Sequence, residues 1–206
     1  MGSELQRFSF AGQESVTESS DAGQRRIGDR MSVSGDSLDL RVAWHCHDAS
    51  IERDAELFWR EQKVLNSDTS ISDRLSELCV VAYVGDRLVA ASTAGLRHID
   101  FLGARVAVFR CSISREFRGR RLSYDLMTRV RQVIEEWSAA NPEEKVMAMT
   151  TAAQTKDTYL GEGPGVFKGS GLTFVGWTAN GERMRVAWFE HARIPRFPPG
   201  WESPGR

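Results

Sequence analysis

The segment from Cys111 to Met127 has the residue types and spacing of an anion site. It reads Cys-Ser-Ile-Ser-Arg-Glu-Phe-Arg-Gly-Arg-Arg-Leu-Ser-Tyr-Asp-Leu-Met, so an apolar stretch passes through a basic turn into a periodic helix. Backbone N–H groups at a helix start lack partners within the helix, and the helix dipole adds partial positive charge. The turn therefore predicts a phosphate or pyrophosphate site, with a solvated basic turn as the alternative. Four arginines strengthen the attraction: Arg115, Arg118, Arg120 and Arg121.

Apolar periodicity around this turn predicts strands alternating with helices in a mixed α/β (α+β) domain. The helix after the turn is the most regular, with Leu122, Leu126, Val130 and Ile134 on one face before Asn141-Pro142 ends it. Strands are expected at residues 38–44, 79–84, 88–93, 104–113, 146–151, 172–178 and 183–189. Helices are expected from Asp48 or Ser50 to about residue 65, from Asp68 or Ser72, over 122–141, and as a short segment beside the glycine loop at 161–165.

Composition places the chain among ordinary globular proteins. It has 206 residues, 41% of them apolar and 27% charged, and a formal net charge of −1. No global field draws such a chain to nucleic acid or membranes, so any anion binding must be local. The three cysteines are widely spaced and form no metal-ligand pattern, which predicts free thiols and no metal. No stretch approaches the ~20 apolar residues of a membrane span, and the N-terminal residues lack the apolar h-region of a secretory signal, so we expect a soluble, cytoplasmic protein.

The two ends of the chain differ from its middle. Residues 1–36 are rich in Ser, Gly, Gln, Asp and Arg and are expected to form a mobile tail, because few apolar residues offset the entropy of ordering. Residues 192–206 carry four of the six prolines and are expected to be extended. The folded domain is therefore predicted to span residues 37–191.

The basic turn in this setting resembles the motif of the GCN5-related N-acetyltransferase (GNAT) family, Gln/Arg-x-x-Gly-x-Gly/Ala. Arg118 matches the first position and Gly119 the glycine that often follows it. Arg121 replaces the first motif glycine and Ser123 the second. The resemblance implies a mixed, mostly antiparallel central sheet of six to seven strands, flanked by about four helices.

The resemblance also implies a cofactor and a reaction. Acetyl-coenzyme A, as co-substrate, would lie where strands 104–113 and 146–151 diverge, with backbone groups of Cys111 and Ile113 pairing with its pantetheine arm. An N-acetyltransferase would pass the acetyl or acyl group directly to a small-molecule or peptide amine. By analogy, the terminal hairpin could form a homodimer. The pyrophosphate would be held by N–H groups of Arg118, Gly119, Arg120, Arg121, Leu122 and Ser123.

The residues for proton transfer depart from the family pattern. Several members use a Glu at the position of Ala107, and many use a Tyr at the position of Phe167. Histidine titrates near neutral pH, so His98 is our candidate base. Tyr159 is the candidate acid. The alternative bases are His45, Glu77 and an ordered water.

Two other functions fit the same residues. A catalytically silent domain of this fold would bind coenzyme A as a regulatory or interaction module. A basic-helix module for RNA or protein would use Arg129 and Arg131, although Glu135, Glu136, Glu143 and Glu144 make that surface mixed in charge and argue against nucleic acid.

Overall fold

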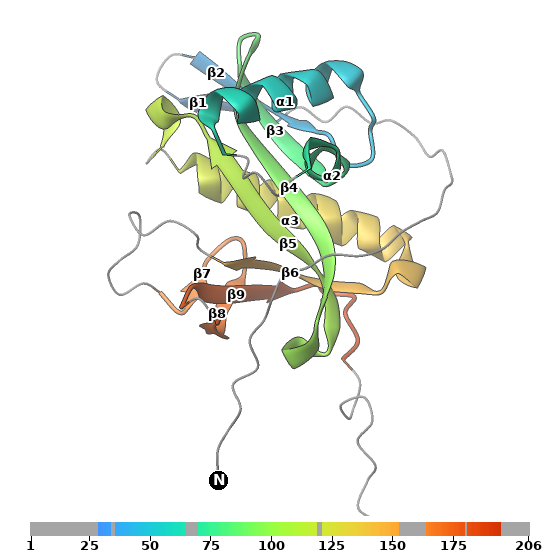
Figure 1. Cartoon of the computed structure of the whole chain (residues 1–206). Helices are drawn as coiled ribbons and strands as arrows, with labels where there is room; N and C mark the ends of the chain where they lie inside the picture. The colour runs from blue at the N-terminus through green and yellow to red at the C-terminus, as the bar shows by residue number, and fades with distance from the viewer. Residues whose placement is uncertain are drawn as a thin grey trace, which may run out of the picture.

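The chain folds into one curled nine-stranded sheet with helices on both faces. The computed structural model describes residues 29–33, 36–64, 70–118, 121–152, 164–179 and 181–194. The strand order is β1-β2-β3-β4-β5-β6-β9-β8-β7. Every neighbouring pair is antiparallel except β5 and β6, which are parallel. Figure 1 shows α1 and α2 in front of the strands and α3 behind them.

The elements follow the chain in an order close to the expected one. The strands are β1 (Asp29–Val33), β2 (Asp36–Val42), β3 (Leu78–Val84), β4 (Arg87–Ile99), β5 (Ala104–Ile113), β6 (Val146–Ala152), β7 (Val166–Phe167), β8 (Leu172–Trp177) and β9 (Arg183–Trp188). The α-helices are α1 (Ala49–Gln62), α2 (Ile71–Ser76) and α3 (Leu122–Ala140). Short 3₁₀ turns are η1 (Asp100–Leu102), η2 (Arg115–Phe117) and η3 (Pro142–Glu144). Within these residues, no helix is both long and apolar enough to cross a membrane.

The strand count is larger than the expected six to seven because two short strands gave no apolar signal. β1 lies inside the stretch that composition assigned to the tail, and it joins the sheet through backbone pairing with β2. β7 pairs with β8 in the region where a short helix was expected. Gly169 and Gly171 have φ of 92° and 69°, which suits a tight hairpin and not a helix. The described residues hold three α-helices where about four were expected.

Each face of the sheet carries its own core. On one face α3 buries Leu122, Leu126, Val130 and Ile134, as its periodicity predicted. On the other face α1 packs its apolar side against β3 and β4. The residues of this second core are Ile51, Ala55, Phe58, Trp59, Leu78, Val81, Tyr83, Leu88 and Ala91.

Asp48 begins α1, as one of the two expected caps. Its Oδ1 accepts hydrogen bonds from the backbone N–H of Ser50 at 2.9 Å and of Ile51 at 3.3 Å. These bonds satisfy two of the donors that a helix start leaves without partners. The cap therefore holds α1 at the register in which its apolar side meets the sheet.

We predict that Asp48→Ala lowers the free energy of unfolding by about 1 kcal/mol, because Ala cannot accept these bonds. Asp48→Asn is the matched control, since its side-chain oxygen still caps the helix. Urea denaturation of both variants measures the effect. An equal loss in both would show that the carboxylate charge, and not capping, is responsible.

Candidate active site

β5 and β6 separate midway along their length. They pair from Arg105 and Val146 as far as Val108 and Thr150. β5 then continues to Ile113, while the last residues of β6 pair on their other side with β9. Figure 1 shows β6 and β9 turning away together from β5. Among the described residues, Phe109–Ile113 therefore form an edge of β5 that β6 leaves open; we call it the open edge.

The backbone of the open edge presents hydrogen-bonding groups to the gap. The N–H of Ser114 donates to the Val89 carbonyl of β4 at 2.9 Å. Backbone groups alternate in direction along a strand, so those of Ile113 and Cys111 face away from β4 and into the gap. One is already engaged, because Arg118 Nε donates to the Ile113 carbonyl at 3.1 Å. The structure thus brings Cys111 and Ile113 to the edge where the cofactor prediction put them.

The helix start lies at the end of this edge. The N–H groups of Tyr124 and Asp125 donate to the Arg121 carbonyl at 2.8 and 3.0 Å. The N–H groups of Leu122 and Ser123 precede these first bonds of α3, and no side chain caps them. Arg118 and Arg121 are exposed beside them. Two members of the predicted set, Gly119 and Arg120, lie outside the described residues.

Arg121 occupies the place of the motif glycine and shows why glycine suits it. Its φ is 60°, in the left-handed region that glycine adopts without strain and other residues adopt at a cost. Its guanidinium lies 5.3 Å from the centroid of the Tyr124 ring, which keeps the charge at the helix start. Arg in place of Gly at position 121 therefore adds strain to the backbone and places a positive charge at the helix start.

Ser114 supplies an unmatched polar group at the same place. Its side chain is buried, and its Oγ has no hydrogen-bond partner among the described residues. A buried hydroxyl without a partner costs free energy.

The histidine candidates for proton transfer lie away from the open edge. His98 pairs with Arg105, and the strand from Arg105 to Phe109 spans about 13 Å. Its Nε2 is 3.7 Å from Asp100 Oδ1. Tyr159 lies outside the described residues.

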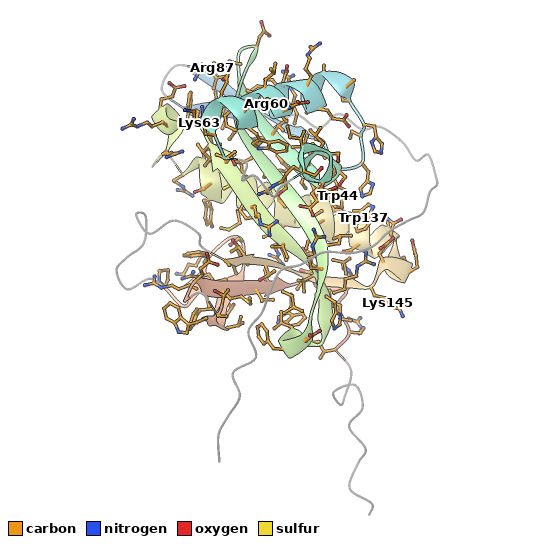
Figure 2. The ribbon with its side chains drawn as sticks, viewed as in Figure 1. Trp44, Arg60, Lys63, Arg87, Trp137 and Lys145 are labelled. Carbon is orange, nitrogen blue, oxygen red and sulfur yellow. The ribbon has the colours of Figure 1, made fainter. Side chains whose placement is uncertain are left out.

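His45 lies at the far end of α3. It stacks on Trp137 with 5.4 Å between ring centroids, and the helix from Leu122 to Trp137 is about 22 Å long. Trp44 packs edge-on against the same ring at 5.4 Å, and Figure 2 shows the two tryptophans together, far from Arg87. Arg87 forms an ion pair with Glu116 of η2, so it marks the opposite end of α3.

Glu77 is the one base candidate that the sheet brings near the open edge, and it is already engaged. Its carboxylate forms an ion pair with Arg97, and its Oε2 lies 3.9 Å from Arg110 Nη1. The carboxylate lies against Gly95 of β4, where a Cβ atom would be 2.5 Å from Oε1. Gly95 therefore makes room for Glu77, which acts as an anchor for arginines. Sequence reasoning missed this cluster because its members come from the residue after α2, from β4 and from β5.

None of the three thiols is activated. Burial raises the pKa of the Cys111 thiol to about 11 and also raises the pKa of Cys79. The pKa of Cys46 is raised by burial and by the charge of Asp48. A thiol with a raised pKa is a poor nucleophile at neutral pH. In the described part of the chain, no three His, Cys, Asp or Glu residues gather closely enough to hold a metal ion.

Comparison with known proteins finds likeness in structure only. No protein-family model matches the chain, and no curated protein matches its sequence. An acetyltransferase of the GNAT family from Streptococcus pneumoniae aligns with 74% of this chain and 99% of its own, at 10% identity and a TM-score of 0.47. An aminoglycoside 6'-N-acetyltransferase complexed with coenzyme A aligns with 76% of this chain and 98% of its own, at 13% identity and 0.46. A bacterial toxin aligns with 80% of this chain and 91% of its own, at 12% identity and a TM-score of 0.48. These likenesses are distant, so we base the function on residues of this chain.

We predict that Gly95→Ala lowers the free energy of unfolding by about 0.5–1 kcal/mol, because the added methyl group displaces the Glu77 carboxylate from its partly exposed arginines. Gly165→Ala is the matched control, since a Cβ atom there meets nothing within 4 Å. Thermal and urea unfolding compare the two variants. A Gly95→Ala protein as stable as the control would mean that Glu77 moves aside freely.

Proposed function

We propose that this protein is an N-acyltransferase that passes an acetyl or other acyl group from acetyl-coenzyme A, or a related acyl-coenzyme A, to an amine. One observation carries the proposal: the open edge of β5 leads directly to the start of α3. Donors and acceptors suited to an extended amide-bearing arm therefore lie in line with donors suited to a pyrophosphate. Neither feature alone would be specific, but their order from strand edge to helix start matches the shape of coenzyme A.

Different groups of the chain bind the two parts of coenzyme A, the extended arm and the phosphates. Backbone groups of Cys111 and Ile113 pair with an extended arm as a further strand would. The N–H groups of Leu122 and Ser123, with Arg118 and Arg121 beside them, hold phosphate oxygens. When bound, acetyl-coenzyme A supplies an acyl group activated as a thioester. The Ile113 carbonyl oxygen has two lone pairs, so it can accept from Arg118 and from the arm together.

Direct attack by the amine is favoured over a covalent route through cysteine. The Cys111 thiol lies on the open edge, but its raised pKa keeps it protonated at neutral pH. The contribution of the protein is then to orient the neutral amine and to remove its proton. His98 and Tyr159 stay as candidates for proton transfer, although the distance of His98 from Phe109 favours a solvent route for the proton at the open edge.

We predict that Arg121→Glu weakens the binding of coenzyme A at least about tenfold, because it reverses a charge at the helix start. Arg53→Glu, an exposed change on α1 with the same effect on net charge, should leave the affinity unchanged. Isothermal titration calorimetry at fixed ionic strength measures both. Equal affinities for the two variants would place the cofactor elsewhere.

We predict that Cys111→Ala retains acyl transfer within about threefold, because the backbone groups remain and the thiol takes no part. Release of free coenzyme A thiol is followed with a chromogenic disulfide, and intact mass is recorded during turnover. If the wild-type protein becomes acylated during turnover and Cys111→Ala is inactive, the reaction passes through an acyl-cysteine and not by direct transfer.

A silent coenzyme A-binding domain is the second candidate, and two substitutions favour it. Ala107 is fully buried where several family members carry the base, and Phe167 lies under Arg185, with 4.3 Å from guanidinium to ring centroid, where many carry the acid. Cofactor binding without thiol release across a broad panel of amines would support this candidate over the enzyme.

A further inference from the structure

A cluster of arginines lies on the sheet face beside the open edge. Arg97 and Arg110 both approach the Glu77 carboxylate, and Arg74 of α2 donates to the Thr93 hydroxyl at 3.4 Å. We call these three arginines with Glu77 the arginine cluster. Its members all face α2, because Thr93 pairs with Arg110 across β4 and β5, and the paired side chains lie on one face.

The charges within the arginine cluster do not balance. Three guanidinium groups surround one carboxylate, and the Glu77 side chain is only 13% exposed. Burial, with the nearby charge of Arg110, lowers the pKa of the Arg74 guanidinium, which identifies the two arginines as close neighbours. Like charges held together in a partly buried place favour binding of an anion.

Arg110 has the most unused bonding capacity of the three. Arg97 pairs directly with Glu77 and also donates to the Leu96 carbonyl at 2.8 Å. The described residues offer Arg110 only the distant Glu77 oxygen, at 3.9 Å, and no hydrogen bond within 3.5 Å. Its side chain is 31% exposed, so a ligand can reach it. A planar guanidinium with free donors matches the two oxygens of a carboxylate or phosphate.

Arg110 places the positive charge of the arginine cluster beside the open edge. Arg110 lies between Phe109 and Cys111 on the open edge, just past the last pair between β5 and β6. Its backbone belongs to the strand that forms the open edge, and its side chain faces α2. Within the proposed acyl transfer, a molecule bound at Arg110 would lie beside the open edge that holds the arm of the acyl carrier.

We propose that the acceptor is a small amine that also carries an oxyanion, a carboxylate or a phosphate, and that Arg110 and Arg74 bind this oxyanion. This inference rests on the proposed acyl transfer for its reaction. The amine nitrogen forms a bond to the acyl carbon, the carbon–sulfur bond breaks, and the proton lost by the amine balances the proton gained by the departing thiol. Arg110 is then a specificity-determining residue that touches substrate away from the reacting atoms.

Matched pairs of amines test the proposal. β-Alanine and 4-aminobutyrate carry a carboxylate, and β-alaninamide and 4-aminobutyramide are their neutral partners. Phosphoethanolamine and ethanolamine form the phosphate arm. We expect kcat/KM for the anionic member of at least one pair to exceed that of its neutral partner at least about tenfold, the effect of one charge-assisted hydrogen bond. Which arm responds distinguishes carboxylate from phosphate.

Binding gives a readout that does not depend on turnover. Calorimetry with coenzyme A present compares the N-acetyl products of the same amines, and the anionic products should bind at least about tenfold more tightly than the neutral ones. Arg110→Gln should abolish this preference while leaving the affinity for coenzyme A and the melting temperature unchanged. Arg105→Gln is the matched control on the same strand: it loses the bond to Glu144 Oε2 at 2.7 Å, so it should lower the melting temperature and keep the preference.

The outcomes separate this inference from the proposed function. Anionic products that bind tightly without any thiol release would support the anion site and overturn the enzyme. Thiol release that is equal for charged and neutral amines would support the enzyme and overturn the anion site. Loss of folding stability in Arg110→Gln, with the anionic preference retained, would make Arg110 a structural residue and overturn its assignment.

Discussion

The separation of β5 from β6 after Val108 is the constraint on which the rest of the site depends. A parallel pair that stops midway leaves backbone donors and acceptors that need other partners. β6 finds its partner in β9, and β5 is left with an edge of five residues that ends at the basic turn. The open edge and the start of α3 follow one another along the chain, and Arg118 Nε, in the turn between them, donates to the Ile113 carbonyl. The cofactor proposal rests on that continuity.

On the face of β4 and β5 that α2 covers, the Glu77 carboxylate approaches the backbone of β4 closely. Gly95 lets the Glu77 carboxylate lie against β4, where any larger side chain would displace it. From there Glu77 holds Arg97 directly and Arg110 at the limit of an ion pair. One carboxylate cannot balance three guanidiniums, so part of the electrostatic cost of the folded state remains beside the open edge. Such a cost is characteristic of places that bind ligands.

The elements set by interactions between residues near in the sequence could be predicted, and those set by contacts between distant residues could not. The bounds expected for β5 and for the start of α3 agree with the structure, because apolar period and glycine-bearing turns act within a few residues. β1 and β7 were missed because backbone pairing with a neighbour, and not side-chain pattern, makes them strands. His98 was chosen for its titration range, but its register opposite Arg105 puts it away from the open edge. Tyr159 and Gly119, outside the described residues, stay predictions.

By itself, the sequence determined the local facts: a helix that begins at Leu122, a basic turn before it, and a strand whose alternation points Cys111 and Ile113 the same way. Those follow from neighbouring residues and from the periods of strand and helix. Only the tertiary structure decided that β6 leaves β5 at Val108, and that Arg74, Glu77, Arg97 and Arg110 meet. Strand partners and charge clusters depend on contacts between distant parts of the chain, which no local pattern specifies.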